Sequence, residues 1–225
     1  MSASTDAADR VAAAIEARDA AAVVAQLADA PELAGALDGQ GRSLLLLALF
    51  FRLPEAADAL REARGDDLGP LEAAATGRVD VLAAHLEADG PGALAARTPE
   101  GFDAIGLAAF LGGADAVELL LRHGADPDGD PDNQLGVRPV HAAAAAGDAA
   151  AMRHLLEAGA DPDSPQGGGV VALHAAAQHD DVDTARVLLD HGADPGRRAD
   201  DGRDAAAFAR DAGSERVLAL LPRAG

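Results

Sequence analysis

The tetrapeptide Gly-Ala-Asp-Pro occurs three times in this sequence, at residues 124–127, 159–162 and 192–195. The three copies begin 35 and 33 residues apart, and each follows a leucine-rich segment such as Met152-Arg153-His154-Leu155-Leu156. Upstream, Arg138–Ala143 (RPVHAA) matches Val171–Ala176 (VALHAA), again with a step of 33 residues. Separate anchors that share one period of about 33 residues indicate a repeat architecture.

The same pattern extends outward from these copies. Four further segments fit it with decreasing clarity: Gly101–Ala109, Gly202–Ala207, Gly41–Ala48 and Pro70–Ala75, while Val11–Leu27 keeps only a two-helix pattern. These residues resemble the ankyrin repeat, whose consensus runs Gly-x-Thr-Pro-Leu-His-x-Ala-Ala, then a second helix ending in Leu-Leu, then Gly-Ala-Asp. The resemblance is strong from about Gly101 to Leu221 and weaker upstream.

The resemblance implies an all-α ankyrin-repeat solenoid of about seven helix pairs, of which the first and the last are caps. A single domain over residues 1–225 is expected, with clear repeats at about 98–199, degenerate repeats at 9–97 and a C-terminal cap at 200–225. Each repeat is a pair of short helices that buries its apolar face only by stacking on its neighbours. In the cap, Val217, Leu218, Leu220 and Leu221 should face the array, with Arg210, Asp211, Glu215 and Arg216 facing water.

Local signals support helix ends at the repeat period. Gly124, Gly159 and Gly192 lie where a helix C-terminus needs a left-handed residue. Asp103 and Asp204 occupy the N-cap position of the first helix, whereas Val171 cannot cap. The step from Leu46 to Glu72 is only 26 residues, so the connection between these repeats should lack most of its hairpin, while the loop at 129–134 should carry two extra residues.

Composition limits the classes of function. The chain has 225 residues with 38 acidic and 18 basic side chains, giving a net charge of −20, and all its basic residues are Arg. Such a negative surface repels phosphate backbones, so we expect no nucleic-acid partner. There is no Cys, no signal-peptide pattern and no apolar run near the ~20 residues that cross a bilayer, so we expect a cytoplasmic protein without a membrane partner. Abundant Ala, Arg and Gly without Lys is typical of a GC-rich, bacterial-like genome.

No motif supports catalysis, a metal or a cofactor. Asp126, Asp128, Asp130 and Asp132 alternate as in a calcium loop, but residue 131 is Pro where Gly is required. The Gly167–Gly169 run has no neighbouring Lys for a phosphate loop and is expected to be a hairpin tip. The resemblance gives His141 and His174 a structural role, with the ring bonded to the backbone of an adjacent turn. His123 and His191 precede glycine caps, where a cation stabilises a helix C-terminus.

The resemblance also places candidate partner-binding residues on the concave side of the solenoid. Phe50 and Phe51 in the second repeat, and Phe110 and Leu111 in the fourth, take the two positions before the turn between the helices. Phe102 lies on a hairpin of the same side. Exposed aromatic side chains are typical binding hot spots. The alternative is that the missing hairpin of the third repeat lets Phe50, Phe51 and Phe110 pack locally as core.

Two further candidates lie near the C-terminus. Gln178 and His179 end the first helix of the sixth repeat, and His179 is the histidine expected to face a partner. Arg197, Arg198 and Arg203 cluster on the last hairpin, where they either bind a carboxylate of a partner or pair with Asp194, Asp200, Asp201 and Asp204.

The function implied by the resemblance is a non-catalytic protein–protein interaction module that binds a partner through its concave groove. The acidic surface favours a partner with a basic segment, and we expect a monomer. The alternative is a dedicated inhibitor, such as an immunity or regulatory protein, that occludes the active site of one enzyme.

Overall fold

The computed structural model describes residues 3–129, 133 and 136–222. Within these residues the regular elements are helices, together with two isolated β-bridges, Leu37–Ser43 and Arg97–Asp103. This confirms the predicted all-α fold. The Cα positions group the chain into two compact units, residues 1–72 and 73–225.

The N-terminal unit contains two helix pairs. Its elements are α1 (Ala3–Glu16), α2 (Ala20–Asp29), the 3₁₀ turn η1 (Pro31–Gly35), α3 (Leu44–Phe50) and α4 (Pro54–Arg64). Helix α1 packs against α2 and α3, and α4 packs against α2, α3 and η1. The first five residues of α3, Leu44 to Ala48, are all buried. A helix that is apolar all round belongs inside a protein, and here it forms the centre of this unit.

A buried ion pair closes the N-terminal unit. The Glu72 carboxylate accepts hydrogen bonds from Ser43 Oγ and Arg64 Nη1, both at 2.5 Å, and from the Gly69 N–H at 2.9 Å. The side chains of Arg64 and Glu72 are 13% and 9% exposed. Gly69 immediately precedes the helix that begins at Pro70 and contains Glu72. The Glu72 carboxylate therefore accepts a hydrogen bond from an N–H that has no partner within the helix.

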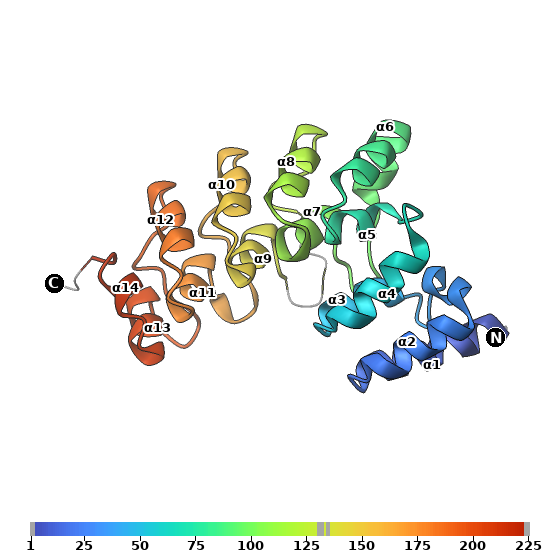
Figure 1. Cartoon of the computed structure of the whole chain (residues 1–225). Helices are drawn as coiled ribbons and strands as arrows, with labels where there is room; N and C mark the ends of the chain where they lie inside the picture. Colours follow the sequence, from blue (N-terminus) through green and yellow to red (C-terminus); the bar gives the residue numbers. More distant parts are fainter. Residues whose placement is uncertain (1–2, 130–132, 134–135, 223–225) are drawn as a thin grey trace. The chain divides into compact units, whose positions relative to one another are not determined.

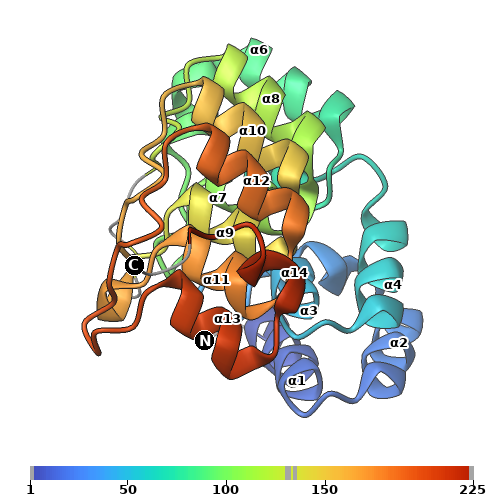
Figure 2. The same ribbon diagram turned by 90° about the vertical axis from the view of Figure 1, so that its left-hand side faces the viewer.

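The C-terminal unit contains stacked helix pairs. Its elements are α5 (Pro70–Ala75), which begins at the boundary of the two units, α6 (Val79–Ala95), α7 (Ala104–Leu107), the π-helical turn η2 (Ala108–Gly112), α8 (Ala114–Arg122), α9 (Pro139–Ala146), α10 (Ala149–Glu157), the 3₁₀ turn η3 (Gly167–Gly169), α11 (Ala172–Gln178), α12 (Val182–Asp190), α13 (Ala205–Ala212) and α14 (Glu215–Leu218). In Figure 1 the second helices α6, α8, α10 and α12 form one row and the first helices α7, α9, α11 and α13 form another. Figure 2 shows the same two rows from the side.

One backbone hydrogen bond recurs at the end of every first helix. An N–H donates to the carbonyl of an alanine five residues earlier, with N···O distances of 2.8–3.0 Å. The acceptors are Ala14, Ala48, Ala73, Ala108, Ala143, Ala176 and Ala209. Because the bond has the same geometry each time, these alanines define a common register for the turn that follows each first helix. We call them the register alanines.

The predicted caps are confirmed. Asp103 accepts a hydrogen bond from the Gly106 N–H at 2.8 Å, and Asp204 accepts one from the Ala207 N–H at 2.9 Å. Val171 gives no side-chain cap, as expected, but the His174 ring accepts a bond from the Val171 N–H instead. At the second helices, Gly159 has φ +102° and ends α10 in the left-handed region that favours glycine.

The fourth first helix ends differently from the others. It finishes in the π turn η2, and Gly112 there approaches the carbonyl oxygen of Ala74 so closely that an added Cβ would lie 1.9 Å from it. Gly77 makes the reciprocal approach, since its own Cβ would lie 2.6 Å from the Gly112 oxygen. The third and fourth helix pairs therefore touch backbone to backbone at these two glycines.

The C-terminal cap has the expected polarity. Val217 and Leu221 are buried and Leu218 and Leu220 are half-buried, while the residues predicted to face water are exposed; these are Arg210, Asp211, Glu215 and Arg216. Helix α14 packs against α11 and α12. Asp180, in the turn before α12, attaches the cap by accepting bonds from Arg216 Nε at 2.6 Å and the Val217 N–H at 3.0 Å. Most of the loop at 129–134 lies outside the described residues.

Candidate functional site

The predicted partner-binding residues share one register. Phe110 and Leu111 lie two and three residues after the register alanine Ala108, and Gln178 and His179 lie at the same places after Ala176. Helix α9 lies between these two first helices and presents Ala145 and Ala146 at the equivalent places. The structure therefore brings Phe110, Leu111, Gln178 and His179 to the same end of one row of helices. We call this row of turns the turn face of the C-terminal unit.

Exposure rises along the turn face. Phe110 and Leu111 are half-buried, whereas Ala145, Ala146, Gln178 and His179 are exposed. Phe50 and Phe51 take the equivalent places in the N-terminal unit, after Ala48, and are also half-buried. Each of these phenylalanine rings therefore packs partly within its own unit and leaves part of its surface exposed to solvent.

The hairpin that carries Phe102 lies beside a cavity. Thr98 N–H donates to the Phe102 carbonyl at 2.9 Å, and the Phe102 N–H donates to Thr98 Oγ1 at 3.2 Å, so the hairpin is closed around a half-buried Phe102. The cavity has a volume of about 450 Å³ and combines apolar residues such as Leu94 and Ile105 with the polar side chains Arg97, Asp103 and Asp126. This cavity was not predictable from the sequence, because the space depends on how successive hairpins pack.

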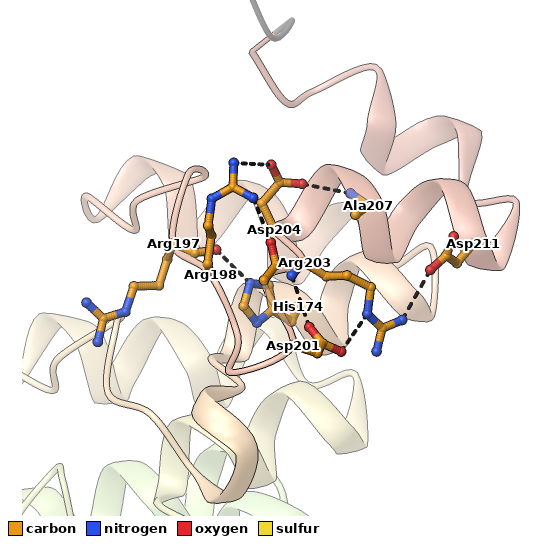
Figure 3. Close-up of polar contacts among 9 residues, drawn as sticks. His174, Arg197, Arg198, Asp201, Arg203, Asp204, Ala207 and Asp211 are labelled. Atoms are coloured by element: carbon orange, nitrogen blue, oxygen red, sulfur yellow. Dashed lines mark hydrogen bonds and ion pairs between the residues drawn. The ribbon is translucent and has the colours of Figure 1, made fainter.

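The arginine cluster of the last hairpin is mostly paired, as the second of the two predicted alternatives requires (Figure 3). Arg203 binds Asp201 at 2.7 Å and Asp211 at 3.1 Å. Arg198 donates to the Gly202 carbonyl at 2.6 Å and lies 3.9 Å from Asp204. Hydrogen bonds from the Arg203 backbone N–H and, second, from its guanidinium hold the pKa of Asp201 below its usual value.

Arg197 differs from the other two. In Figure 3 its side chain points away from the carboxylates, and it has no side-chain partner among the described residues. Its backbone carbonyl, in contrast, accepts a hydrogen bond from His174 Nε2 at 3.0 Å. Arg197 is thus the member of the cluster whose charge is available to another molecule.

The carboxylates of the hairpin edge bond to backbone from one repeat to the next. Asp128 accepts from the Asp161 N–H at 3.1 Å, and Asp163 accepts from the Asp194 N–H at 3.0 Å. These bonds fix a line of negative charge along the edge of the C-terminal unit. Such a line contributes to the negative field of the protein.

The histidines have structural roles where the sequence predicted them. His141 Nδ1 accepts from the Arg138 N–H at 3.1 Å, and its Nε2 donates to the Ser164 carbonyl at 2.8 Å. His174 makes the equivalent bonds. His123 and His191 lie at helix C-termini with Nδ1 3.0 Å and 2.8 Å from the carbonyls of Leu119 and Val187.

Among the described residues, no group of three or more His, Cys, Asp or Glu side chains is arranged to hold a metal ion. Asp130 and Asp132 of the alternating acidic loop lie outside the described residues. In the part of the chain that the structure describes, no helix combines the length and the apolar character needed to cross a bilayer.

Comparison with known proteins agrees with the geometry. The family model described as ankyrin repeats (3 copies) matches residues 71–166, 105–199 and 141–224, which together span 71–224. No protein of curated function matches the chain. Ankyrin repeats are in general protein–protein interaction modules, and the family is in general non-catalytic. The chain belongs to the ankyrin-repeat family.

Proposed function

We propose that this protein is a non-catalytic module that binds a partner protein through the concave groove of the family, with the turn face and the hairpins that precede the first helices as its binding surfaces. In the C-terminal unit the proposed binding residues are Phe102, Phe110, Leu111, Gln178 and His179, whereas Arg203 is paired with Asp201 and Asp211. Phe50 and Phe51 serve the same purpose in the N-terminal unit. The observation that carries this proposal is that Phe110 and Leu111 share a register with the exposed pair Gln178 and His179.

The contrast along the turn face supports a two-part contact. Phe110 and Leu111 offer partly exposed apolar surface, and exposed Ala145 and Ala146 follow in the next repeat, where short side chains leave room for a bound chain. Large apolar side chains supply most of the affinity at interfaces, while polar neighbours such as Gln178 supply orientation. Because the helices are already formed, binding costs little ordering entropy.

The charge of the protein supports a partner with a basic segment. With a net charge of −20, long-range attraction accelerates association with a cationic segment and weakens as salt increases. We propose that the protein does not bind nucleic acid, because its negative field repels the phosphate backbone. We also propose that the protein acts as a monomer in the cytoplasm, where a chain without Cys needs no oxidising environment.

The test is affinity capture from the native lysate with the full chain, followed by binding and melting measurements on two matched variants. Phe110→Ala removes a half-buried ring of the turn face, and we expect partner affinity to fall by ~2 kcal/mol, roughly thirtyfold in Kd, with little change in melting. Phe208→Ala removes a ring that is 8% exposed and should cost ~3–5 kcal/mol of folding stability.

Two results would count against this proposal. A loss of melting temperature in Phe110→Ala as large as that in Phe208→Ala would place Phe110 in the core. Full partner affinity in Phe110→Ala would place the binding surface elsewhere. If the captured partner is an enzyme that loses activity in the complex, the protein is instead a dedicated inhibitor.

A further inference from the structure

His174 is held in one protonation state by its two hydrogen bonds. Its Nδ1 faces the Val171 N–H at 3.2 Å, and its Nε2 faces the Arg197 carbonyl at 3.0 Å. An N–H can only donate and a carbonyl can only accept, so Nδ1 carries no proton and Nε2 carries one. The side chain is 1% exposed. The native contacts of His174 therefore require the neutral ring.

The neutral ring is the base of a stack that holds the last repeat. The Phe208 ring of α13 lies 4.7 Å from the His174 ring, centroid to centroid, with an angle of 19° between the planes. The Arg203 guanidinium lies 4.2 Å from the Phe208 centroid. Arg203 is in turn fixed by Asp201 of its hairpin and Asp211 of α13 (Figure 3). His174 thus contacts the last hairpin through a hydrogen bond and the last helix pair through a ring face.

Protonation of His174 works against its burial beneath the Phe208 ring and against the Val171 contact, whereas Nε2 still donates to the Arg197 carbonyl. A proton on Nδ1 would face the Val171 N–H, so an attractive bond would become a contact between two donors. The charged groups that act on the ring come from the last hairpin and the start of α13, where Asp201 and Asp204 favour the cation and Arg203 opposes it. Burial outweighs the carboxylates and the Arg197 carbonyl, and it holds the pKa of His174 below its usual value.

The sign of the pH effect follows from this direction. An unfolded histidine has a pKa of about 6.5, so the unfolded chain takes up the proton before native His174 does. The stability that neutral His174 contributes is therefore fully present above this pH and is lost as the pH falls below it. The pKa of Asp180 and that of Asp201 lie below the usual value because of their arginine partners, so their ion pairs keep their charges in the same range.

The position of His174 in the array makes the effect local. His141 makes equivalent bonds, but repeats stack on both sides of it, whereas the last repeat has a neighbour on one side only. At acidic pH the last repeat keeps the attachment through Asp180, the packing of α13 against α11, and two hydrogen bonds to the preceding repeat, from Ser214 Oγ to the Gln178 carbonyl at 3.4 Å and from the Asp200 N–H to the Gly168 carbonyl at 2.9 Å. Ends of a structure open at lower free energy than its centre.

We propose that His174 is a proton-sensitive latch between the last two repeats, so that acidification from about pH 7.5 to pH 5 releases the hairpin at 197–203 and helix α13 from α11. The hairpin that the latch releases carries the exposed Arg203. The proposed pH response does not require a bound partner. In this pH range histidine is the side chain that changes charge.

Hydrogen exchange of the full-length protein tests the latch at pH 7.5 and 5.0, after correction for the intrinsic exchange rate. We expect a loss of protection at pH 5.0 for the amides of Ala199, Ala207 and Phe208, which are hydrogen-bonded in the native hairpin and α13. Helix α4 is the internal reference, because residues 1–72 contain no histidine.

Two variants test whether His174 causes the loss of amide protection at pH 5.0. His174→Gln keeps a donor and an acceptor but has no charge to gain, so protection at 197–212 should become independent of pH, whatever its level. His191→Gln removes a histidine from a helix C-terminus, where a cation is stabilising, and should keep the wild-type pH dependence. The latch is refuted by full protection of wild-type residues 197–212 at pH 5.0, by an equal loss in α4, or by an unchanged pH dependence in His174→Gln. The first two results come from the wild type and hold even if the variants fold poorly.

Discussion

The contact between Gly77 and Gly112 predicts that Gly112→Ala is unusually destabilising. Gly112 does not have a positive φ, so alanine adopts its backbone conformation without strain. The new Cβ would lie 1.9 Å from the Ala74 oxygen, whereas ordinary contacts begin at 3.4 Å. The two backbones must therefore separate by roughly 1.5 Å, and no side-chain rotation can relieve the clash.

The energy of this separation can be bounded. Overpacking costs ~1–3 kcal/mol, and a backbone obstacle favours the upper end of that range. The alanine returns ~0.5 kcal/mol by restricting the unfolded chain. A net loss of ~2–3 kcal/mol lowers the melting temperature of a chain of this size by about 5–10 °C.

Thermal unfolding followed by circular dichroism measures this loss, with Gly90→Ala as the matched control. Gly90 also lacks a positive φ, and its Cβ would meet no atom within 4 Å. We expect the control to melt at or slightly above the wild-type temperature. If Gly112→Ala melts together with Gly90→Ala, the third and fourth helix pairs do not touch at these glycines and the reasoning fails.

Two further changes test the Arg64–Glu72 ion pair and the C-terminal cap. Glu72→Ala should lower the free energy of unfolding in urea by ~3 kcal/mol, because it leaves the buried Arg64 charge without its partner. Glu72→Gln keeps an acceptor for the Gly69 N–H and should cost less. Equal losses in the two variants would contradict the ion-pair argument. Deleting residues 200–225 should expose the apolar faces of α11 and α12 and cause aggregation or a large loss of melting temperature; a monomeric truncated protein with unchanged melting would show that these residues are no cap.

Features that repeat with the period were predictable from the sequence. The Gly-Ala-Asp-Pro copies and the His141 and His174 positions share one spacing, so helix ends, glycine caps and ring-to-backbone bonds followed from it. The caps at Asp103 and Asp204 were predictable for the same reason, because a short carboxylate can accept the free N–H groups of a first turn. The period also located the turn face, since it aligned Phe110 with Gln178.

Features that depend on a departure from the period were not predictable. Glu72 stands at a histidine position, and nothing local indicates that its carboxylate reaches Ser43 and Arg64. The backbone contact at Gly112 depends on a π turn that the sequence does not mark. The degree of burial of Phe110 depends on tertiary packing, so the choice between groove and core could not be made from residue type alone.

Asp180 shows how one such departure serves the cap. The turns after the first helices of the third, fifth and seventh pairs use Gly77, Gly147 and Gly213 in the left-handed region, but Asp180 takes this place in the sixth pair with φ +53°. Aspartate tolerates this conformation better than most residues, though less well than glycine.

The carboxylate offsets the unfavourable backbone conformation, because it reaches the first turn of α14 and accepts bonds from Arg216 and Val217. A glycine would relax the turn and lose both bonds. The contacts of the last repeat with its neighbour therefore include two of different chemistry, a carboxylate whose pKa is lowered by Arg216 and a histidine ring whose native bonds require the neutral form. Because only the second contact weakens on acidification, the hairpin side of the last repeat should open before the α14 side.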